Sequence, residues 1–442
     1  FHLSLHAILS LGIDNKQGFV VCRSGHMNTF YHRNGRLYAD LIAVEDVAGA
    51  AGTPLFLYSR RHLRSQYLQL AEAMRPARPL ICYSVKANSN ATILQTFLKQ
   101  GSGFDIVSGG ELYRALNIGA NPRKIVFAGV GKTADEIEYA IRENILFFTV
   151  ESEQEASRIS DCARRLRRTA RIAFRVNPDV DPKTHRYIAT GKKETKFGLD
   201  INRTINACRT AATLPNVEIA GLHLHIGSQI LSSRPFAQAL GKVEKLCTEL
   251  RQRFRTFRYI DIGGGIGIQY RPGQNELSPV DFASAVLPAL KRMDLSAVLE
   301  PGRFLVGNAC ILVCRVQYIK KSGRKIFVVV DAGMNDLIRP SLYDAYHEVV
   351  PVTRRNGTIR GDLVGPICES GDFLALNRQL PMVRQGDLLA VKSAGAYGFS
   401  MSSNYNSRPR AAEVMVDGRR FTIIRRRETF RDLIRNEIMP RA

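Results

Sequence analysis

Long apolar runs and paired cysteines are both missing from this sequence. No stretch of about 18 consecutive apolar residues occurs in its 442 residues, so we expect no membrane-spanning helix. None of the eight cysteines belongs to a Cys-x-x-Cys pair, and neither Cys310 nor Cys314 has a nearby histidine. This spacing argues against a zinc site and against a disulfide framework. We therefore predict no metal and a reducing, cytoplasmic environment.

Acidic residues are scarce relative to basic ones. The chain has 63 lysines and arginines against 40 aspartates and glutamates, which gives a net charge of +23. Such a charge can indicate nucleic-acid binding. However, the arginines are scattered among apolar residues, as on solvated helix faces, and no aromatic residues are interleaved with them. We expect no nucleic-acid partner; a positive potential around an anionic cofactor is another use for the charge.

The middle of the chain alternates short apolar runs with longer segments of helical periodicity. Repeated strand–helix alternation is typical of a parallel barrel. Eight such runs predict a (β/α)8 TIM-type barrel. The runs are Leu80–Val85, Phe104–Val107, Ile125–Ala128, Leu146–Val150, Arg171–Val176, Ile219–Leu224, Tyr259–Ile262 and Ala297–Leu299.

After about residue 305 the pattern changes to runs rich in valine and isoleucine, separated by turns. This pattern predicts a mostly antiparallel β domain. Two early segments, Leu37–Ala39 and Pro54–Tyr58, are candidates to join it. The later runs are Ala309–Ile319, Lys325–Asp331, Gln385–Ser393, Ala412–Val416 and Arg419–Ile424.

These patterns suggest a division of the chain into domains. Residues 59–304 are predicted to form the barrel and residues 305–442 the C-terminal β domain, with residues 27–58 as an N-terminal segment that joins the β domain. Ordinary domain texture begins at Met27, so residues 1–26 are interpreted as an upstream or added extension.

A lysine follows the first predicted barrel strand. Barrel enzymes place their reactive residues at the carboxyl ends of the strands. Lys86 comes directly after Leu80–Val85 and would point into the barrel mouth. There the amine would lose solvation, which would lower its pKa and make it a nucleophile. The alternative is a strand-end lysine that reaches out to solvent.

The sixth and seventh predicted strands end in histidines and glycines. His223 and His225 lie on one face of a strand, which suits either a metal pair or an imidazole stacked on a flat cofactor ring. Gly227 and Ser228 follow with a backbone amide and a hydroxyl suited to phosphate. The glycines within 263–267 would let backbone amides approach a phosphate closely, although any tight loop uses glycine.

The eighth predicted strand ends in an acid. Glu300 at a buried strand end must be paired or protonated. A pyridine nitrogen is a suitable partner, because a carboxylate there keeps the ring protonated and able to accept electrons. The alternative is an ion pair between Glu300 and Arg303.

Taken together, these motifs resemble the meso-diaminopimelate decarboxylases, which belong to the alanine racemase-like (fold type III) enzymes that use pyridoxal phosphate (PLP). The resemblance runs from about Met27 to the C-terminus and implies a barrel followed by a β domain. It also implies a homodimer with shared active sites. Seven motifs carry it: Tyr83–Asn88, His225–Ser228, Gly263–Gly265, Glu300–Arg303, Arg339–Tyr343, Cys368–Asp372 and Ala394–Gly398.

The resemblance implies a role for each cofactor residue. Lys86 would be the PLP lysine, His225 would stack on the ring and Glu300 would pair with the pyridine nitrogen. The remaining cofactor contacts would come from Ser228, Gly264, Gly265, Gly302, Arg303 and Tyr397.

It also implies a substrate set. The family's substrate carries two carboxylates, one of which must be bound while the other leaves as CO2. Arg303, Arg339 and Tyr343 would bind the far carboxylate, and Tyr397 would contact both substrate and cofactor. The partner subunit would supply the loop 368–369, with Cys368 as proton donor and Glu369 for the distal ammonium.

Several alternatives stay open at this point. Another fold type III decarboxylase would act on ornithine, arginine or carboxynorspermidine, but the Arg339–Tyr343 motif and Glu369 favour diaminopimelate. A racemase of the same fold would tend to have arginine in place of Glu300. A non-catalytic PLP-binding homologue would be expected to have lost Lys86 or Cys368, and both are present.

Overall fold

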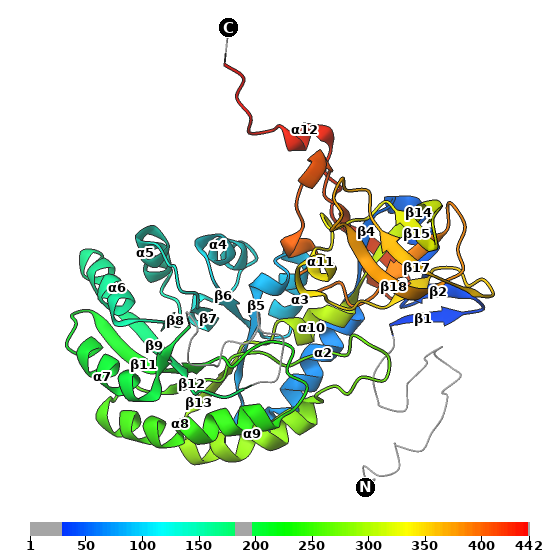
Figure 1. Cartoon of the computed structure of the whole chain (residues 1–442). Helices are drawn as coiled ribbons and strands as arrows, with labels where there is room; N and C mark the ends of the chain where they lie inside the picture. The colour runs from blue at the N-terminus through cyan, green and yellow to red at the C-terminus, as the bar shows by residue number, and fades with distance from the viewer. Residues whose placement is uncertain (1–28, 182–196, 441–442) are drawn as a thin grey trace.

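The chain folds into a barrel and a sheet domain that lie side by side (Figure 1). The computed structural model describes residues 29–181 and 197–440. The predicted extension, residues 1–26, lies outside the described residues. In the part described, no helix is long and apolar enough to cross a membrane.

Eight parallel strands close the barrel, because β8 pairs with β9 at the end of the series β9-β11-β12-β13-β5-β6-β7-β8. Each strand overlaps one of the eight apolar runs, so the predicted (β/α)8 barrel is confirmed. A short strand, β10 (Leu199–Asp200), continues the sheet beside β9. The barrel strands are β5 (Leu80–Ser84), β6 (Gly103–Ile106), β7 (Ile125–Phe127), β8 (Phe147–Val150), β9 (Ala170–Asn177), β11 (Val217–Leu224), β12 (Tyr259–Asp261) and β13 (Ser296–Leu299).

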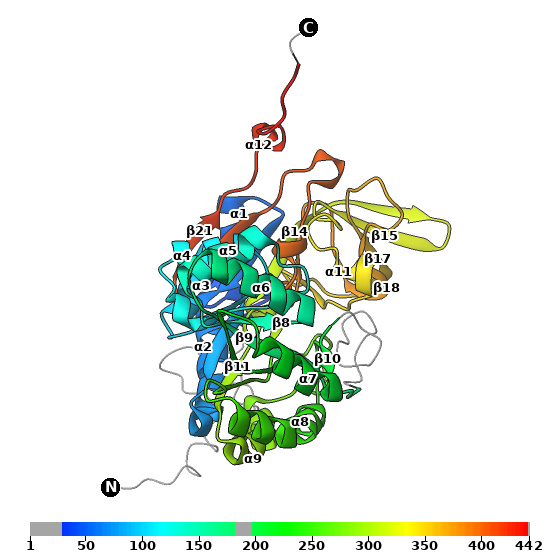
Figure 2. The same ribbon diagram turned by 90° about the vertical axis from the view of Figure 1, so that its left-hand side faces the viewer.

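Helices surround the barrel strands on the outside (Figures 1 and 2). Each buries one face; α5, for example, buries Ile137, Ala140 and Ile141. It begins at a capping box in which Thr133 and Glu136 satisfy each other's backbone amides. The helices are α2 (Arg60–Ala73), α3 (Ala91–Leu98), α4 (Gly109–Asn117), α5 (Ala134–Glu143), α6 (Glu153–Arg165), α7 (Ile201–Ala211), α8 (Arg234–Arg253) and α9 (Pro279–Met293).

The second domain is a mixed sheet that is antiparallel in most of its pairings, as predicted. Its main path runs β18-β17-β15-β14-β4-β20-β21, and β16 and β19 attach through β14. The parallel pairs are β15–β17 and β4–β20. The strands are β4 (Leu55–Ser59), β14 (Cys310–Ser322), β15 (Lys325–Val330), β16 (Val349–Pro351), β17 (Thr358–Val364), β18 (Phe373–Pro381), β19 (Leu388–Val391), β20 (Ala412–Asp417) and β21 (Arg420–Arg425).

The N-terminal part of the described chain lies against this sheet. β4 pairs with both β14 and β20, so residues just before the barrel sit in the middle of the second domain. The small sheet β1 (Phe30–Arg33), β2 (Arg36–Ala39) and β3 (Ile42–Ala43) precedes helix α1 (Val44–Ala51). It touches the larger sheet where the Leu37 amide donates to the Val352 carbonyl oxygen, N···O 2.7 Å. The domain boundaries themselves stay a prediction.

Within the large sheet of the second domain, the sequence pattern did not predict three of the described strands: β16, β17 and β18. β17 contains Gly361, and a Cβ there would lie 2.4 Å from the Ile326 carbonyl oxygen of β15. Where two strand backbones approach closely, a glycine interrupts the apolar run, and without that run the strand is not recognised from the sequence. β18 carries Asn377, Arg378 and Gln379 in its second half, which hides its period of two. Three short helices complete the domain: α10 (Arg303–Val306), α11 (Arg339–Tyr343) and α12 (Phe430–Leu433).

Candidate active site

A cavity of about 500 Å³ opens at the carboxyl ends of the barrel strands and is closed on one side by the sheet domain. Both parts of the chain line it. The predicted site residues that line it are Lys86, His225, Ser228, Glu300 and Arg303 from the barrel side, and Arg339, Tyr343 and Tyr397 from the second domain.

Lys86 is paired with a carboxylate that the sequence analysis did not predict. Its Nζ lies 2.5 Å from Oδ2 of the fully buried Asp105 on β6, and the Ser84 hydroxyl donates to the same oxygen, O···O 2.6 Å. Burial acts to lower the pKa of Lys86, but Asp105 and Glu300 outweigh it and raise that pKa above its ordinary value. The expected lowering of the Lys86 pKa was therefore wrong. An aspartate inside the apolar run 104–107 was the available signal.

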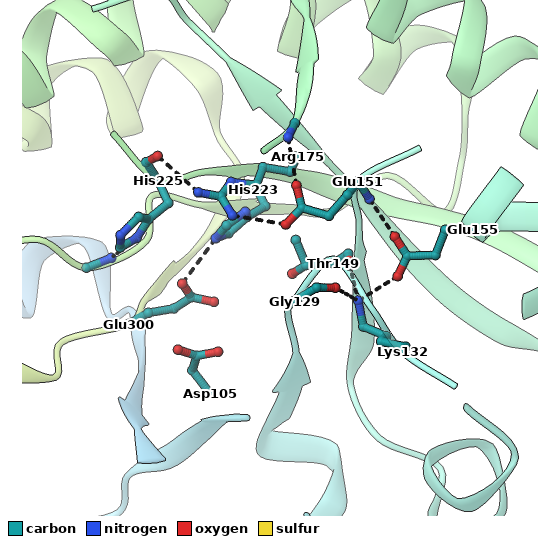
Figure 3. A network of polar contacts seen from close by, with 12 residues as sticks. Asp105, Gly129, Lys132, Thr149, Glu151, Glu155, Arg175, His223, His225 and Glu300 are labelled. Atoms are coloured by element: carbon teal, nitrogen blue, oxygen red, sulfur yellow. Dashed lines mark hydrogen bonds and ion pairs between the residues drawn. The ribbon is translucent and has the colours of Figure 1, made fainter. Parts of the chain in front are cut away.

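Glu300 accepts a hydrogen bond from His223, Nε2···Oε2 3.1 Å, and both side chains are buried (Figure 3). Burial acts to raise the pKa of Glu300, but His223 and Lys86 hold it below its ordinary value, so the group is a carboxylate. Its other oxygen, Oε1, is buried and has no hydrogen-bond partner among the described residues. That oxygen is a buried acceptor for a ring N–H or for the neighbouring Asp261 carboxyl, which also hydrogen bonds to Glu300. The alternative ion pair between Glu300 and Arg303 does not form.

Asp261, at the end of β12, lies beside this pair. One ligand atom each from His223, Asp261 and Glu300 lie within 4.8 Å of one another, a spacing that would also suit a metal ion. His223 and Glu300, however, already bond to each other, and Asp261 accepts from the Gly263 amide, N···O 2.9 Å. Burial and Glu300 raise the pKa of Asp261 well above its ordinary value, which favours a neutral acid here. The prediction that the chain binds no metal stays a prediction.

His225 presents a neutral ring to the cavity. Burial and the nearby Arg175 lower its pKa well below the ordinary value. The Gly264 amide donates to its Nδ1, N···N 3.3 Å, so the ring proton resides on Nε2. Arg175 donates to the His225 carbonyl oxygen and is itself held by Glu151, N···O 3.0 Å (Figure 3). A neutral flat ring in this place suits stacking on a flat cofactor.

The glycine loop after β12 packs where no side chain fits. A Cβ on Gly264 would lie 2.1 Å from the Glu300 carbonyl oxygen. Gly265 has a φ of +103°, and its Cβ would lie 2.4 Å from the Gly227 carbonyl oxygen. Ser228 stands beside the loop and accepts from Arg303, N···O 3.1 Å. The loop is therefore a tightly packed backbone segment next to Ser228, which lines the cavity together with Arg303.

The guanidiniums of Arg303 and Arg339 converge on a tyrosine of the cavity wall. Arg303 donates to the Tyr270 hydroxyl, N···O 2.6 Å, and the Arg339 guanidinium lies 4.9 Å from the Tyr270 ring centre. Arg339 also donates to His347, N···N 2.9 Å. Both arginines are buried, and neither forms an ion pair with a carboxylate of the described chain. Tyr270 and His347 come from loops that carried no sequence signal.

The two residues predicted to come from a partner subunit do not reach the cavity of their own chain. Cys368 and Glu369 are exposed on a loop between β17 and β18. The Cys368 amide donates to the Asn406 side-chain oxygen, N···O 2.7 Å. The loop is tied down from inside by Asp372, whose two oxygens accept from the Met334 and Ile367 amides, each N···O 2.6 Å. One chain therefore brings six of the predicted cofactor residues to one cavity but leaves Cys368 and Glu369 on an outer surface. Gly264, Gly265 and Gly302 are not among the residues that line the cavity.

The fold and the lysine–glutamate–glycine arrangement define the class of PLP-binding barrels. Residues 60–307 match the family model described as pyridoxal-dependent decarboxylase, pyridoxal binding domain. The residues present fit the cofactor, since Glu300 is a buried carboxylate that lines the cavity with Lys86 and the glycine loop leaves room only for backbone. The predicted cofactor, PLP, is confirmed.

Similar proteins narrow this class. The chain is 49% identical to the diaminopimelate decarboxylase of Aquifex aeolicus over 90% of this chain and 95% of that protein. It is 47% identical to that of Pseudomonas aeruginosa over 93% and 99%. The crystal structure of diaminopimelate decarboxylase from Helicobacter pylori complexed with L-lysine has a TM-score of 0.86 at 42% identity, covering 89% of this chain and 98% of that one. The chain belongs to the diaminopimelate decarboxylase family, as the sequence motifs predicted.

A structure with lower sequence identity has the same fold. The lysine/ornithine decarboxylase from Vibrio vulnificus, solved with putrescine, has a TM-score of 0.75 at 22% identity. At this identity the likeness concerns the fold alone. The choice between substrates therefore depends on the residues of the cavity.

Proposed function

We propose that this chain removes one carboxylate of meso-2,6-diaminopimelate as CO2 and releases L-lysine, the last step of lysine biosynthesis. The observation that carries the proposal is the pair of buried guanidiniums, Arg303 and Arg339, which have no carboxylate partner in the described chain. Buried charges need a counter-charge, and a guanidinium fork suits a carboxylate. A substrate with a second carboxylate supplies it.

The residues predicted to bind the cofactor would each hold a different part of it. PLP, when bound, accepts the electrons released as the carboxylate leaves. Lys86 would hold the cofactor, and Glu300 would keep a proton on the ring nitrogen by remaining a carboxylate beside His223. His225 would stack on one ring face. Ser228, Gly264, Gly265, Gly302 and Arg303 would hold the phosphate, with Tyr397 nearby.

The substrate's far end would lie against the arginine end of the cavity. Arg303, Arg339 and Tyr343 would bind the carboxylate that stays, and Tyr397 would contact both substrate and cofactor. A polyamine-forming decarboxylase has no second carboxylate to bind and would leave the two guanidiniums without a carboxylate partner. The geometry therefore favours diaminopimelate over ornithine, arginine or carboxynorspermidine.

We also propose a cytoplasmic homodimer with shared active sites. A loop that holds Cys368 and Glu369 on an outer surface suits delivery into another subunit's cavity. There Cys368 would return a proton to the reacting carbon and Glu369 would bind the distal ammonium. The cysteines of the described chain are free thiols, in keeping with a reducing compartment.

A substrate panel tests the proposal. CO2 release is measured from meso-diaminopimelate, ornithine, arginine and carboxynorspermidine with PLP-loaded enzyme. We expect turnover of meso-diaminopimelate with kcat/KM at least about 100-fold above the others, because the buried arginines would otherwise have no carboxylate counter-charge. Preferred turnover of ornithine would overturn the substrate assignment. No turnover of any of the four would favour a non-catalytic homologue.

A further inference from the structure

His347 is a fully buried histidine that has no role in the proposed reaction. It lies four residues after α11, in the loop that leads to β16, and its ring is 0% exposed. Burial and the neighbouring Arg339 hold its pKa at about 3, so the ring is neutral. A neutral imidazole that is buried in this way is expected to have a hydrogen-bond partner for each of its two nitrogens.

The partners of His347 determine its tautomer. Nδ1 lies 2.8 Å from the Lys392 carbonyl oxygen, which can only accept, so Nδ1 carries the proton. Nε2 is then an acceptor, and Arg339 Nη1 donates to it at 2.9 Å. A guanidinium has no acceptor atom, so the two assignments agree. His347 thus links Arg339 to the backbone of the sheet domain.

The surroundings make this link rigid. Arg378 donates to the His347 carbonyl oxygen and places its guanidinium 3.8 Å from the centre of the Tyr346 ring. The Tyr270 ring meets the His347 ring edge-on, with centres 5.3 Å apart. Arg339 therefore hydrogen bonds to His347 and to Tyr270, whose ring also packs against the guanidinium, and it lines the cavity.

We propose that His347 is a positioning residue that fixes the Arg339 guanidinium and so makes the site selective for ligands with a carboxylate at their far end. The inference deepens the proposed function and relies on it for the identity of the ligand. Holding the guanidinium in place before the ligand arrives removes the ordering cost from binding. Without the Nε2 acceptor, a buried N–H of Arg339 would lose its partner and turn away from the ligand.

Two conservative variants separate the two ring nitrogens. In His347→Asn, the side-chain amide can still donate to the Lys392 carbonyl but is too short to reach Arg339. In His347→Gln, the longer amide can still accept from Arg339. A merely structural role would predict similar effects from both. His32→Asn is a control, because His32 hydrogen bonds to the Pro351 carbonyl in the same domain and does not line the cavity.

The measurement compares two ligands that differ by one carboxylate. L-lysine and cadaverine are titrated into PLP-loaded enzyme by calorimetry, which needs no turnover. We expect His347→Asn to weaken L-lysine binding about tenfold, the cost of one buried hydrogen bond, and to leave cadaverine unchanged. His347→Gln should stay within about threefold of wild type for both ligands. The KM for meso-diaminopimelate should follow L-lysine, with kcat nearly constant.

Several outcomes would overturn the inference. Equal weakening by the Asn and Gln variants would do so, as would an equal loss of cadaverine binding. If the Asn variant does not fold, the Gln variant decides alone, because weakened L-lysine binding there contradicts a role of the acceptor. Failure of the proposed function has a different signature, since wild-type enzyme would then release no CO2 from meso-diaminopimelate whatever the ligand-binding result.

Discussion

At the scale of single residues, buried charges in this site are set by their partners rather than by burial alone. Burial opposes the charge on both Lys86 and Glu300, yet both are charged because Asp105 and His223 stand beside them. The sequence shows Asp105 inside an apolar run and His223 at a strand end, but it does not show that they face Lys86 and Glu300. Asp105 is 19 residues from Lys86 in the chain, and His223 is 77 residues from Glu300.

Replacing Lys86 tests the central assignment. We expect Lys86→Ala to abolish CO2 release and to remove the site at which borohydride attaches the cofactor covalently to the chain. The reason is that Lys86, alone among the lysines of the described residues, lines the cavity beside Glu300. Absorbance spectra and peptide mapping after reduction provide the measurement. Lys99→Ala, at an exposed position at the end of α3, is the matched control. Label on another lysine in wild type would contradict the assignment.

Glu300→Gln tests the charge at the ring nitrogen. The amide keeps the shape of the side chain but not its negative charge, so the ring would lose its proton. We expect kcat to fall about 100-fold, as for the loss of one electrostatic stabiliser. PLP affinity, followed by fluorescence titration, should fall less than tenfold because the phosphate cradle is unchanged. An unaltered kcat would show that the carboxylate has no such role.

At the scale of elements, the loop after β12 shows why its glycine motif could be recognised from the sequence. Gly263 to Gly265 sit where β11 and β13 leave room only for backbone, and the Gly265 φ of +103° disfavours any other residue. The eight barrel strands were predictable for a related reason. Parallel strands buried on both faces read as continuous apolar runs.

Gly264→Ala is expected to damage this loop. The new Cβ would lie 2.1 Å from the Glu300 carbonyl oxygen, so the loop must shift at a cost of about 1–3 kcal/mol. We expect weaker PLP binding in fluorescence titration and a lower melting temperature. Gly241→Ala in α8 is the control, because nothing lies within 4 Å of its Cβ and alanine there should stabilise the helix by about 0.5–1 kcal/mol. Equal melting temperatures for both variants would contradict the steric argument.

At the scale of the whole molecule, buried neutral histidines make the fold sensitive to acid. The pKa of His347 is about 3 in the folded chain and near 6.5 when unfolded, so the unfolded chain binds more protons between these values. The stability that it contributes is present above about pH 6.5 and is lost as the pH falls toward 3. Glu111 and Asp336, whose pKa values burial raises to about 7, act in the opposite direction.

Comparing wild type with the His347→Gln variant separates the contribution of His347 to the pH dependence of stability from that of the other groups. We expect wild type to lose about 1.4 kcal/mol more stability than His347→Gln between pH 7.5 and pH 5.5. Urea unfolding at both pH values provides the measurement, and the shared carboxylates cancel in the difference. An identical loss in the two proteins would mean that His347 is not held neutral in the fold.

The proposed sharing of active sites between two subunits predicts complementation between inactive variants. If Cys368 serves the partner's cavity, a one-to-one mixture of Lys86→Ala and Cys368→Ala subunits forms heterodimers with one intact site. Random pairing should restore about a quarter of wild-type activity. Co-expression with two affinity tags allows the heterodimer to be purified and assayed. A mixture of Lys86→Ala with the double variant is the control. Heterodimers without activity would show that each chain uses its own Cys368.

The sequence by itself determined the strand order of the barrel and the residues at its strand ends, because a strand and the residue that follows it are adjacent in the chain. Only the tertiary structure decided which charges meet. Asp105, Arg175, Tyr270 and His347 join the site from separate strands and loops, and their side chains carry no periodic signal. Closure of the barrel and packing of the sheet domain against it bring these residues together.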